Sequence, residues 1–543
     1  MEAESVPVDE GSKRIVVMQD DQTPPGSQNT SCTEGHLRDT GGPSGSSAWL
    51  ALGAGREGQP KRHAEPSSGV GLTHSTDEAV EGNETVEGRG RPERNLLQGA
   101  QGRTQSRVPL PVHLQRVNEA AKRDKRARCT ALLHHVDVHA LGRAFLRLKR
   151  HASAGIDGQT VQTYEQNLEA NLQALCAKVH RGSYRALPVR RAYIPKADGG
   201  ERPLGIPALE DKILQSAVAE VLGAIYEVDF LGFSYGFRPG RNPHQALDAL
   251  HTALMSQSVC WVLDADIRKF FDSVDHGWLL RMLAHRIADQ RVLHLIEMWL
   301  KAGVLENGAI TETSLGTPQG SSISPLLGNV FLHYVLDLWV HRWRQTQAHG
   351  RVIVVRYCDD FVMGFQLARD ARTCLEELRA RLGKFSLSLH EAKTRLIAFG
   401  RLVALDRRNR GVRRPATFAF LGFTHYCGWT RDGRFVVKRR TQSKRLTAKL
   451  KALRLETKRR MHAPVVDQHR WLCQVLRGHY AYFGLPSNFP SLHVFGREVC
   501  RLWFRALRRR SQRRLTWAGF NQILALLPLP TPHILFQRNL ARG

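Results

Sequence analysis

The stretch VVRYCDDFVMGF, Val354 to Phe365, decides the fold, because it places two adjacent carboxylates between two runs of β-forming residues. Short runs of β-branched and aromatic residues on both sides of a tight polar step predict a β-hairpin with Asp359 and Asp360 at its tip. Such a pair is compatible with a solvated turn as well as with a metal site. The rest of the chain must distinguish these two interpretations.

A third carboxylate follows another predicted strand, in CWVLDADIRKFFD (260–272), which begins as a buried strand and then becomes polar. If this strand and the hairpin are neighbours in one sheet, Asp266 and the two hairpin carboxylates converge at one end of it. Such a cluster of hard oxygen ligands suits two Mg²⁺ ions and favours in-line attack of a 3′-hydroxyl on a nucleotide's α-phosphate. The alternative is that Asp264 and Asp272 make Asp266 one solvated acid among several.

The charge of the chain is large and unevenly distributed. The 543 residues contain 79 Lys and Arg against 50 Asp and Glu, a formal net charge of +29. Residues 1–100 hold nine basic and sixteen acidic groups, so the remaining 443 hold 70 and 34, a net of +36. A field of this size attracts polyanions and favours contacts with phosphates that release counterions.

Cysteine usage and hydropathy indicate the compartment. The nine cysteines are scattered without a C-x-x-C pair, which argues against a zinc ribbon and a disulfide framework and suits a reducing cytosol. No apolar run approaches the roughly 18–20 residues of a membrane span, and the N-terminus lacks the core of a signal peptide. We expect a cytoplasmic protein with no membrane partner.

Composition and residue pattern divide the chain into three regions: residues 1–108, a second region that ends at about residue 440, and the remainder. The first is rich in Gly, Ser, Glu, Thr and Pro and is predicted to be disordered, because it cannot bury enough apolar surface to offset the entropy of ordering it. The second mixes strand and helix patterns, with a strand, turn and strand over 190–207 and an apolar helix over 324–343. The third is helical and basic. These patterns predict an α+β fold followed by a helical domain.

Nine stretches between about residues 110 and 530 closely resemble the reverse transcriptases encoded by bacterial group II introns, also called intron maturases. They occur in one order and at the family's spacing: GIDGQTV (155–161), YIPKADGGERPLGIP (193–207), SYGFRPGRNPHQAL (234–247), DADIRKFFDSVDH (264–276), GTPQGSSISPLLGN (316–329), RYCDDFV (356–362), LSLHEAKTRLIAFG (387–400), FAFLGF (418–423) and RGHYAYFGLPSN (477–488).

The resemblance implies a right-hand polymerase, with fingers and palm on a mixed and antiparallel sheet over 109–425 and an α-helical thumb or maturase domain over 426–543. The implied activity is RNA-directed DNA polymerisation by two-metal-ion nucleotidyl transfer, together with binding of intron RNA to assist splicing and mobility. The implied cofactors are two Mg²⁺ ions, with Mn²⁺ as a substitute. The implied partners are an RNA template and primer, the intron RNA, a DNA target and deoxynucleoside triphosphates, and binding of target DNA implies association with the bacterial nucleoid.

The resemblance also assigns metal and nucleotide ligands by position. Asp266, Asp359 and Asp360 match the catalytic metal-binding triad, with the backbone carbonyl of Ile267 as a further ligand. The positions that match nucleotide contacts are Lys196 and Arg202 for the triphosphate, Phe271 for the 2′ position of the sugar, Gln319 near nucleotide and template, and Lys393 near the leaving pyrophosphate. The alternatives stay open, since one of Phe270 and Phe271 is expected to be a core aromatic and the three cations can be solvated surface charges.

The end of the chain is predicted to contact nucleic acid. A basic helical stretch there has aromatic residues interleaved with arginines, and the alternative is a solvated helix face. The residues concerned are Arg508, Arg509, Arg510, Arg513 and Arg514, with Trp503 before them and Trp517 after them.

The chain departs from the family pattern in three places. Cys358 stands where the family usually has Ala, and we expect it to have a packing role. No pair of Cys/His clusters follows residue 500, so we expect no metal-dependent nuclease domain of the kind found in some relatives. The last twenty residues also differ from the expected ending, which is compatible with a short truncation.

Three functions remain open from the sequence. The first is an active reverse transcriptase that assists its intron. The second is a non-catalytic splicing factor on a decayed polymerase scaffold, against which the intact carboxylates argue. The third is a domesticated reverse transcriptase used in defence or repair.

Overall fold

The structure is a computed structural model that describes residues 111–195, 200–306, 308–311, 314–412, 416–510 and 515–535. The chain divides into two units, Met1–Glu87 and Gly88–Gly543, and every described residue belongs to the second. The predicted disorder of 1–108 therefore lies outside the described residues. So do three predicted site residues, Lys196, Arg513 and Arg514.

The sheet that carries the opening motif, called the central sheet here, has the strand order β6-β7-β3-β8. Its strands are β6 (Val352–Tyr357), β7 (Asp360–Phe365), β3 (Trp261–Ala265) and β8 (Arg395–Ala398), and all neighbours are antiparallel. Tyr357 pairs with Asp360, so Cys358 and Asp359 form a two-residue hairpin loop. The predicted hairpin and the predicted pairing of its second strand with the 261–265 strand are both confirmed.

The central sheet is buried on both faces, and successive side chains enter two different cores, as the two-residue period of a strand requires. Leu263, Phe361 and Met363 belong to the core formed with α5 (Leu209–Asp229), α10 (Ser324–Leu332) and α12 (Ala368–Gly383). Val262 and Val362 belong to the core formed with α6 (Pro243–Ser256). This double burial explains why the strands read as continuous apolar runs.

The predicted helix over 324–343 exists, but it is interrupted. After α10 the chain forms one π-helical turn, η3 (His333–Asp337), and then continues as α11 (Leu338–Thr346). A π turn widens the helix and shifts the direction of the side chains that follow, and such turns are frequent at functional sites. Here the turn ends on Asp337, which is fully buried.

A second sheet, called the outer sheet, has the order β2-β1-β4-β5. The predicted strand, turn and strand correspond to β1 (Val189–Pro195) and β2 (Glu201–Ile206), which pair antiparallel. β1 runs parallel to β4 (Val304–Glu306), which pairs with β5 (Ala309–Thr311). The remaining helices before β4 are α1 (Val112–Arg123), η2 (Leu133–His135), α2 (Val138–Leu146), α3 (Val161–Glu165), α4 (Leu168–His180), α7 (Phe270–Ser273), α8 (His276–Ala284) and α9 (Gln290–Lys301).

A small sheet of order β11-β10-β9 joins the central sheet to the C-terminal helices. Its strands are β9 (Thr417–Phe420), β10 (Phe423–Trp429) and β11 (Phe435–Thr441), preceded by α13 (Arg401–Asn409). The predicted domain boundary at residue 425 lies inside β10, so a division there would separate paired strands. The change from sheet to helix follows Thr441.

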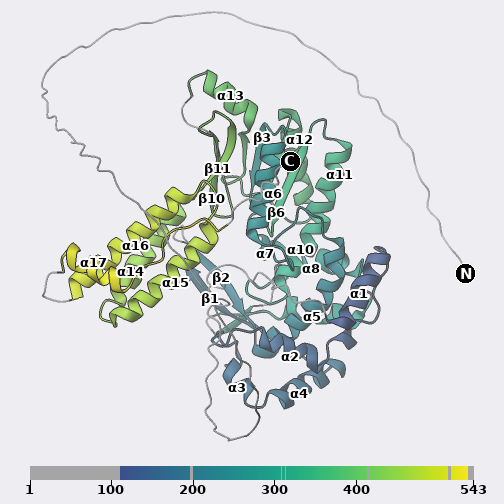
Figure 1. The fold of residues 1–543 in the computed structure, drawn as a ribbon. Coiled ribbons are helices and arrows are strands. Elements are labelled where there is room, and N and C mark those ends of the chain that lie inside the picture. The colour runs from purple at the N-terminus through teal and green to yellow at the C-terminus, as the bar shows by residue number, and fades with distance from the viewer. Residues whose placement is uncertain are drawn as a thin grey trace, which may run out of the picture. The chain divides into compact units, whose positions relative to one another are not determined.

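Among the described residues, four helices follow the small sheet, coloured yellow-green to yellow in Figure 1, and enclose a core of their own. They are α14 (Ser443–Arg459), α15 (Val465–Phe483), α16 (Phe489–Arg510) and α17 (Trp517–Leu526). The Thr441 N–H donates to Asn488 Oδ1 at 2.7 Å, which attaches the end of β11 to the start of α16. Over the described ranges, no helix has the length and apolarity that crossing a membrane requires.

Candidate active site

Three carboxylates meet where β3 ends and the β6–β7 hairpin turns. Ala265 pairs with Phe361, so the next pair along the ladder would be Asp266 and Asp360, with Asp359 in the loop beside them. Burial, followed by the charges of neighbouring aspartates, raises the pKa of Asp360 to about 7. Burial also raises the pKa of Asp359, and the Asp266 charge adds to this. The predicted convergence is therefore present, and the carboxylates repel one another electrostatically.

Asp266 is held in position by the chain that precedes β8. The His390 N–H donates to Asp266 O at 2.7 Å, and the Arg268 N–H donates to Ser388 O at 2.8 Å. Ile267 lies between these two hydrogen bonds as a non-hydrogen-bonded antiparallel pair, so its own N–H and carbonyl point away from the 388–390 segment. This orientation agrees with the predicted use of the Ile267 carbonyl as a ligand.

Three cations among the described residues lie near the carboxylates or next to Asp264. Lys393 Nζ lies 2.6 Å from Asp266 Oδ2, and an Arg395 nitrogen lies 2.9 Å from Asp264 Oδ2. Arg202, exposed on β2, is close enough for its charge to lower the pKa of Asp359, against the larger effect of burial. Lys393 thus contacts one of the predicted metal ligands directly.

The donor set fits divalent magnesium in its chemistry. Carboxylate oxygens and a backbone carbonyl are hard ligands, and carboxylates that raise one another's pKa gain from a nearby dication. In the part of the chain that the structure describes, no three His, Cys, Asp or Glu side chains already form a metal-binding cluster. The Lys393 ammonium already pairs with Asp266, a carboxylate that the magnesium ions would need as a ligand.

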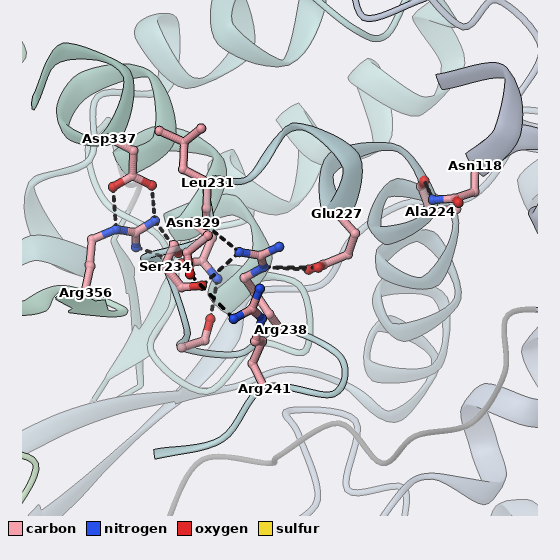
Figure 2. A network of polar contacts seen from close by, with 12 residues as sticks. Asn118, Ala224, Glu227, Leu231, Ser234, Arg238, Arg241, Asn329, Asp337 and Arg356 are labelled. Atoms are coloured by element: carbon pink, nitrogen blue, oxygen red, sulfur yellow. Dashed lines mark hydrogen bonds and ion pairs between the residues drawn. The ribbon is translucent and has the colours of Figure 1, made fainter. Parts of the chain in front are cut away.

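A buried arginine, Arg356, anchors the hairpin to the interior of the protein (Figure 2). Arg356 and Asp337 are both fully buried and form a bidentate ion pair, with Nε to Oδ1 at 2.7 Å and Nη2 to Oδ2 at 2.5 Å. The remaining donors reach Asn329 Oδ1 at 2.9 Å, the Cys358 carbonyl at 2.9 Å and Ser234 Oγ at 2.8 Å. All five N–H donors of the guanidinium are used, one of them on the hairpin loop itself.

The residues around Arg356 are themselves fixed by close packing. Asn329 Nδ2 donates to the Gly236 carbonyl at 2.7 Å. A Cβ at Gly236 would lie 2.3 Å from the backbone nitrogen of Cys358, so no side chain fits between this segment and the hairpin. Figure 2 shows the network continuing to Arg238, which donates to the Ser234 carbonyl at 2.8 Å and pairs with Glu227 at 3.0 Å.

Cys358 is buried, which agrees with the predicted packing role. Its φ of +62° is a left-handed backbone conformation, which a two-residue hairpin loop of this type needs at its first residue. Burial, with the Asp359 charge adding, raises the pKa of the thiol well above its usual value, so the thiol is neutral. The thiol also donates a hydrogen bond to Asp359, which works to lower the pKa of that carboxyl. This contact is an addition to the packing role predicted for Cys358.

The FAFLGF stretch closes the site from the side of the small sheet. The Leu421 N–H donates to Asp360, and the Ala419 N–H donates to Asp264. Leu421 has a φ of +46°, and its carbonyl accepts from the Tyr482 hydroxyl on α15 at 2.8 Å. Backbone donors from β9 and the following turn therefore stabilise the ionised forms of two carboxylates.

Two of the residues predicted to contact the nucleotide, Phe271 and Gln319, lie on α7 and in the glycine-rich loop before α10. Phe270 is buried and Phe271 is partly exposed, with ring centroids 5.1 Å apart, so Phe270 is the core aromatic of the pair. Gln319 Nε2 lies 3.4 Å from Asp272 Oδ1, and its backbone carbonyl accepts from the Gly205 N–H at 2.8 Å. Because Gly205 is on β2 with Arg202, the glycine-rich loop links the outer sheet to the Phe271 segment.

The arginines at the end of α16 are exposed, but one of the aromatic residues is not. Arg508, Arg509 and Arg510 are exposed in the last turn, and Arg510 donates to the Ala463 carbonyl at 3.0 Å. Trp503 is fully buried and donates to Gln468 Oε1 at 3.2 Å. The interpretation of Trp503 as part of a nucleic-acid surface is therefore wrong, since it lies on the apolar face of α16.

Comparison with known proteins agrees with this geometry. Residues 194–425 match the family model described as reverse transcriptase (RNA-dependent DNA polymerase). The chain is 34% identical over 273 residues to Protein YkfC of Escherichia coli, a match that covers 45% of this chain and 71% of that protein. It is 38% identical over 200 residues to the group II intron-encoded protein LtrA of Lactococcus lactis, covering 36% of this chain and 33% of LtrA.

The chain belongs to the group II intron-encoded reverse transcriptase/maturase family. It is also 44% identical over 146 residues to an uncharacterized 91 kDa protein in the cob intron of Schizosaccharomyces pombe, covering 27% of this chain and 18% of that protein. Except for YkfC, the match thus spans a third or less of these relatives. The comparisons support an intron reverse transcriptase/maturase function for the chain.

The sequence analysis missed the anchor of the hairpin. The motif RYCDDFV contains Arg356 without indicating a role for it, and no sequence pattern singles out its partners Asp337, Asn329 and Ser234. One signal was available, because a single charge inside the apolar run VIVVRY must be paired if the strand is buried.

Replacing Asp360 with Asn tests whether burial and the neighbouring aspartates destabilise the charged form of this carboxyl. A carboxyl whose folded-state pKa is about 7 favours folding while it is protonated, and this contribution is lost as the pH rises through 7. In a chelator, Asp360→Asn is therefore expected to be more stable than wild type by roughly 1–3 kcal/mol at pH 8, with a smaller difference at pH 5. Urea unfolding at both pH values measures it. A difference that is the same at both, as expected for the exposed control Asp432→Asn, would contradict the coupling.

Replacing Arg356 tests the buried anchor. Arg356→Met leaves Asp337 buried and unpaired, and it is expected to lower the free energy of unfolding by about 3–5 kcal/mol. The double variant Arg356→Met/Asp337→Leu removes both charges and is expected to recover most of this loss. The control Arg434→Met breaks an exposed ion pair with Asp432 and is expected to cost less than about 1 kcal/mol. A double variant no more stable than the single one would show that the anchor does not act as a charge pair.

Proposed function

We propose that this protein is an RNA-directed DNA polymerase that extends a primer on an RNA template and binds its intron RNA to assist splicing and mobility. The observation that carries the proposal is the convergence of Asp266, Asp359 and Asp360 at one end of an antiparallel sheet. In a polymerase scaffold without catalytic activity, three mutually repelling carboxylates would lower stability and serve no function.

Asp266, Asp359, Asp360 and the Ile267 carbonyl would hold two Mg²⁺ ions, or Mn²⁺ as a substitute. When bound, the ions lower the pKa of the primer 3′-hydroxyl and stabilise charge on the α-phosphate and the leaving group. The protein's part is to fix the carboxylates: the ladder positions Asp266 and Asp360, and Arg356 holds the loop that carries Asp359.

The nucleotide is proposed to lie between the carboxylates and β2. Arg202, whose charge lowers the pKa of Asp359, would bind the triphosphate with its forked donors, and Lys196 would assist it. Lys393 would exchange its contact with Asp266 for one near the pyrophosphate. The partly exposed ring of Phe271 would exclude a 2′-hydroxyl, while Gln319 would contact nucleotide and template.

We propose the family's division of labour for the three parts of the fold. The outer sheet and the helices before it would form the fingers, the central sheet the palm, and α14 to α17 the thumb or maturase region. Arg508, Arg509 and Arg510, with Arg513 and Arg514 after them, would contact phosphates of the template duplex or the intron RNA. The proposed partners also include the DNA target of the intron.

Asp359→Ala tests the catalytic proposal in two assays. Primer extension on an RNA template is expected to fall by at least about 10³-fold, because a metal ligand is lost. Splicing of the cognate intron is expected to survive, since the protein contributes binding and the RNA contributes the chemistry. Asp432→Ala, an exposed aspartate in another hairpin, is the matched control and should retain both activities. Wild-type protein that never extends a primer with Mg²⁺ would overturn the polymerase proposal.

Replacing the helix-end arginines tests the RNA contact. Arg508→Ala/Arg509→Ala is expected to weaken binding of intron RNA and to reduce the slope of log affinity against log salt by about 1 to 2, because each phosphate contact releases counterions. Filter binding from 50 to 300 mM KCl measures the slope. The control Arg150→Ala removes an exposed arginine paired with Glu165 and should leave the slope unchanged. Equal slopes for all three proteins would exclude this helix end from the interface.

A further inference from the structure

The glycine-rich loop 316–320 lies between β2 and Phe271, two parts of the proposed nucleotide site, and contacts both. On one side, Gly205 of β2 donates to the Gln319 carbonyl at 2.8 Å, and a Cβ at Gly320 would lie 2.6 Å from the Gly205 carbonyl oxygen. On the other side, the Thr317 N–H donates to the Phe271 carbonyl at 2.7 Å. The position of the loop therefore determines how far Phe271 lies from β2, the strand that carries Arg202.

A buried histidine, His276, binds the first residue of this loop. His276 Nε2 donates to the Gly316 carbonyl at 2.7 Å, and the histidine is 7% exposed. The Gly316 N–H donates to the Val274 carbonyl at 2.8 Å, so both backbone groups of this glycine are bound to the segment that follows Phe271. Gly316 has a φ of +89°, and a Cβ there would lie 3.0 Å from the Phe271 carbonyl oxygen. The contact thus requires glycine at 316.

His276 is itself held by the start of α8. It is the first residue of that helix, and the preceding Asp275 accepts from the Trp278 N–H at 2.7 Å as the helix cap. Asp275 also pairs with Leu315 in an isolated antiparallel bridge, directly before the loop. The imidazole therefore projects from a rigid helix start onto the first residue of the loop.

We propose that His276 is a positioning residue for the nucleotide site. By fixing Gly316, it sets the loop that holds Phe271 and Gln319 at their distance from β2. It thereby determines the affinity for the incoming nucleotide and the discrimination against ribonucleotides. This inference rests on the proposed polymerase function, and it assigns His276 no contact with the reacting atoms.

The kinetic test compares two substitutions at the same position. His276→Leu fills the space without a donor, whereas His276→Gln retains an N–H at a similar distance. For His276→Leu we expect KM for the deoxynucleotide to rise about 5- to 10-fold, the factor for one buried hydrogen bond, with kcat changed less than about twofold. The ratio of deoxynucleotide to ribonucleotide incorporation should fall with it. His276→Gln should restore both values to within about twofold of wild type.

The matched control is His294→Leu, which replaces an exposed histidine on α9 and should leave KM and the incorporation ratio unchanged. An unchanged KM and ratio in His276→Leu would overturn the inference. So would a failure of His276→Gln to restore them, because the effect would then come from packing and not from the hydrogen bond.

A measurement without catalysis separates this inference from the polymerase proposal. Hydrogen–deuterium exchange of the 315–321 peptide is expected to quicken at least about 5-fold in His276→Leu, and not in His276→Gln or His294→Leu. If wild-type protein extends no primer, the polymerase proposal fails while this exchange result still decides the positioning role. Equal exchange in wild type and His276→Leu would overturn it.

Discussion

The ion pair between Arg356 and Asp337 is the interaction on which the candidate site depends. It lies entirely inside the protein, where an unpaired charge would cost several kcal/mol, and it uses two of the five guanidinium donors, while the other three bind Asn329, Ser234 and Cys358. One of those donors binds the Cys358 carbonyl, so the loop that carries Asp359 is tied to the interior by the same residue that belongs to β6. The π-helical turn before α11 and the glycine at 236 both serve this contact, the first by ending on Asp337 and the second by leaving room for the loop.

A rigid support of this kind is needed because the carboxylates it presents oppose their own assembly. Burial, followed by the charges of neighbouring aspartates, raises the pKa of Asp360 to about 7, and the Leu421 N–H opposes this only in part. Arg202 and the Ala419 N–H likewise lower the pKa of Asp359 and of Asp264 against the larger effect of burial, and Lys393 pairs with Asp266. We propose that a cluster with this excess of negative charge binds cations before any substrate arrives. The same excess explains why Lys393 pairs with Asp266, and why a polyanionic substrate would need metal ions to approach.

Local patterns predicted the parts of the fold that depend on neighbouring residues. The hairpin, the 190–207 pair of strands and the 324–343 helix follow from turn residues and hydrophobic period, and the sheet neighbours β3 and β7 follow once three acids are assumed to share one site. The hairpin anchor could not be found in this way, since Ser234 and Asp337 come from distant segments and nothing near Arg356 identifies them. Trp503 was misassigned although its spacing from Leu492, Phe495 and Val499 places it on the buried face of α16. The ligand roles, the domain boundaries and the use of the helix-end arginines stay predictions.

The central claim is that Asp266, Asp359 and Asp360 act together as one binding site for divalent cations. Electron paramagnetic resonance of Mn²⁺, titrated into the full chain bound to a primer–template, tests this most directly. The account predicts a population of tightly bound Mn²⁺ in wild type and in the exposed control Asp432→Asn, and its loss in both Asp266→Asn and Asp359→Asn. Equal Mn²⁺ binding by all four proteins would contradict the account.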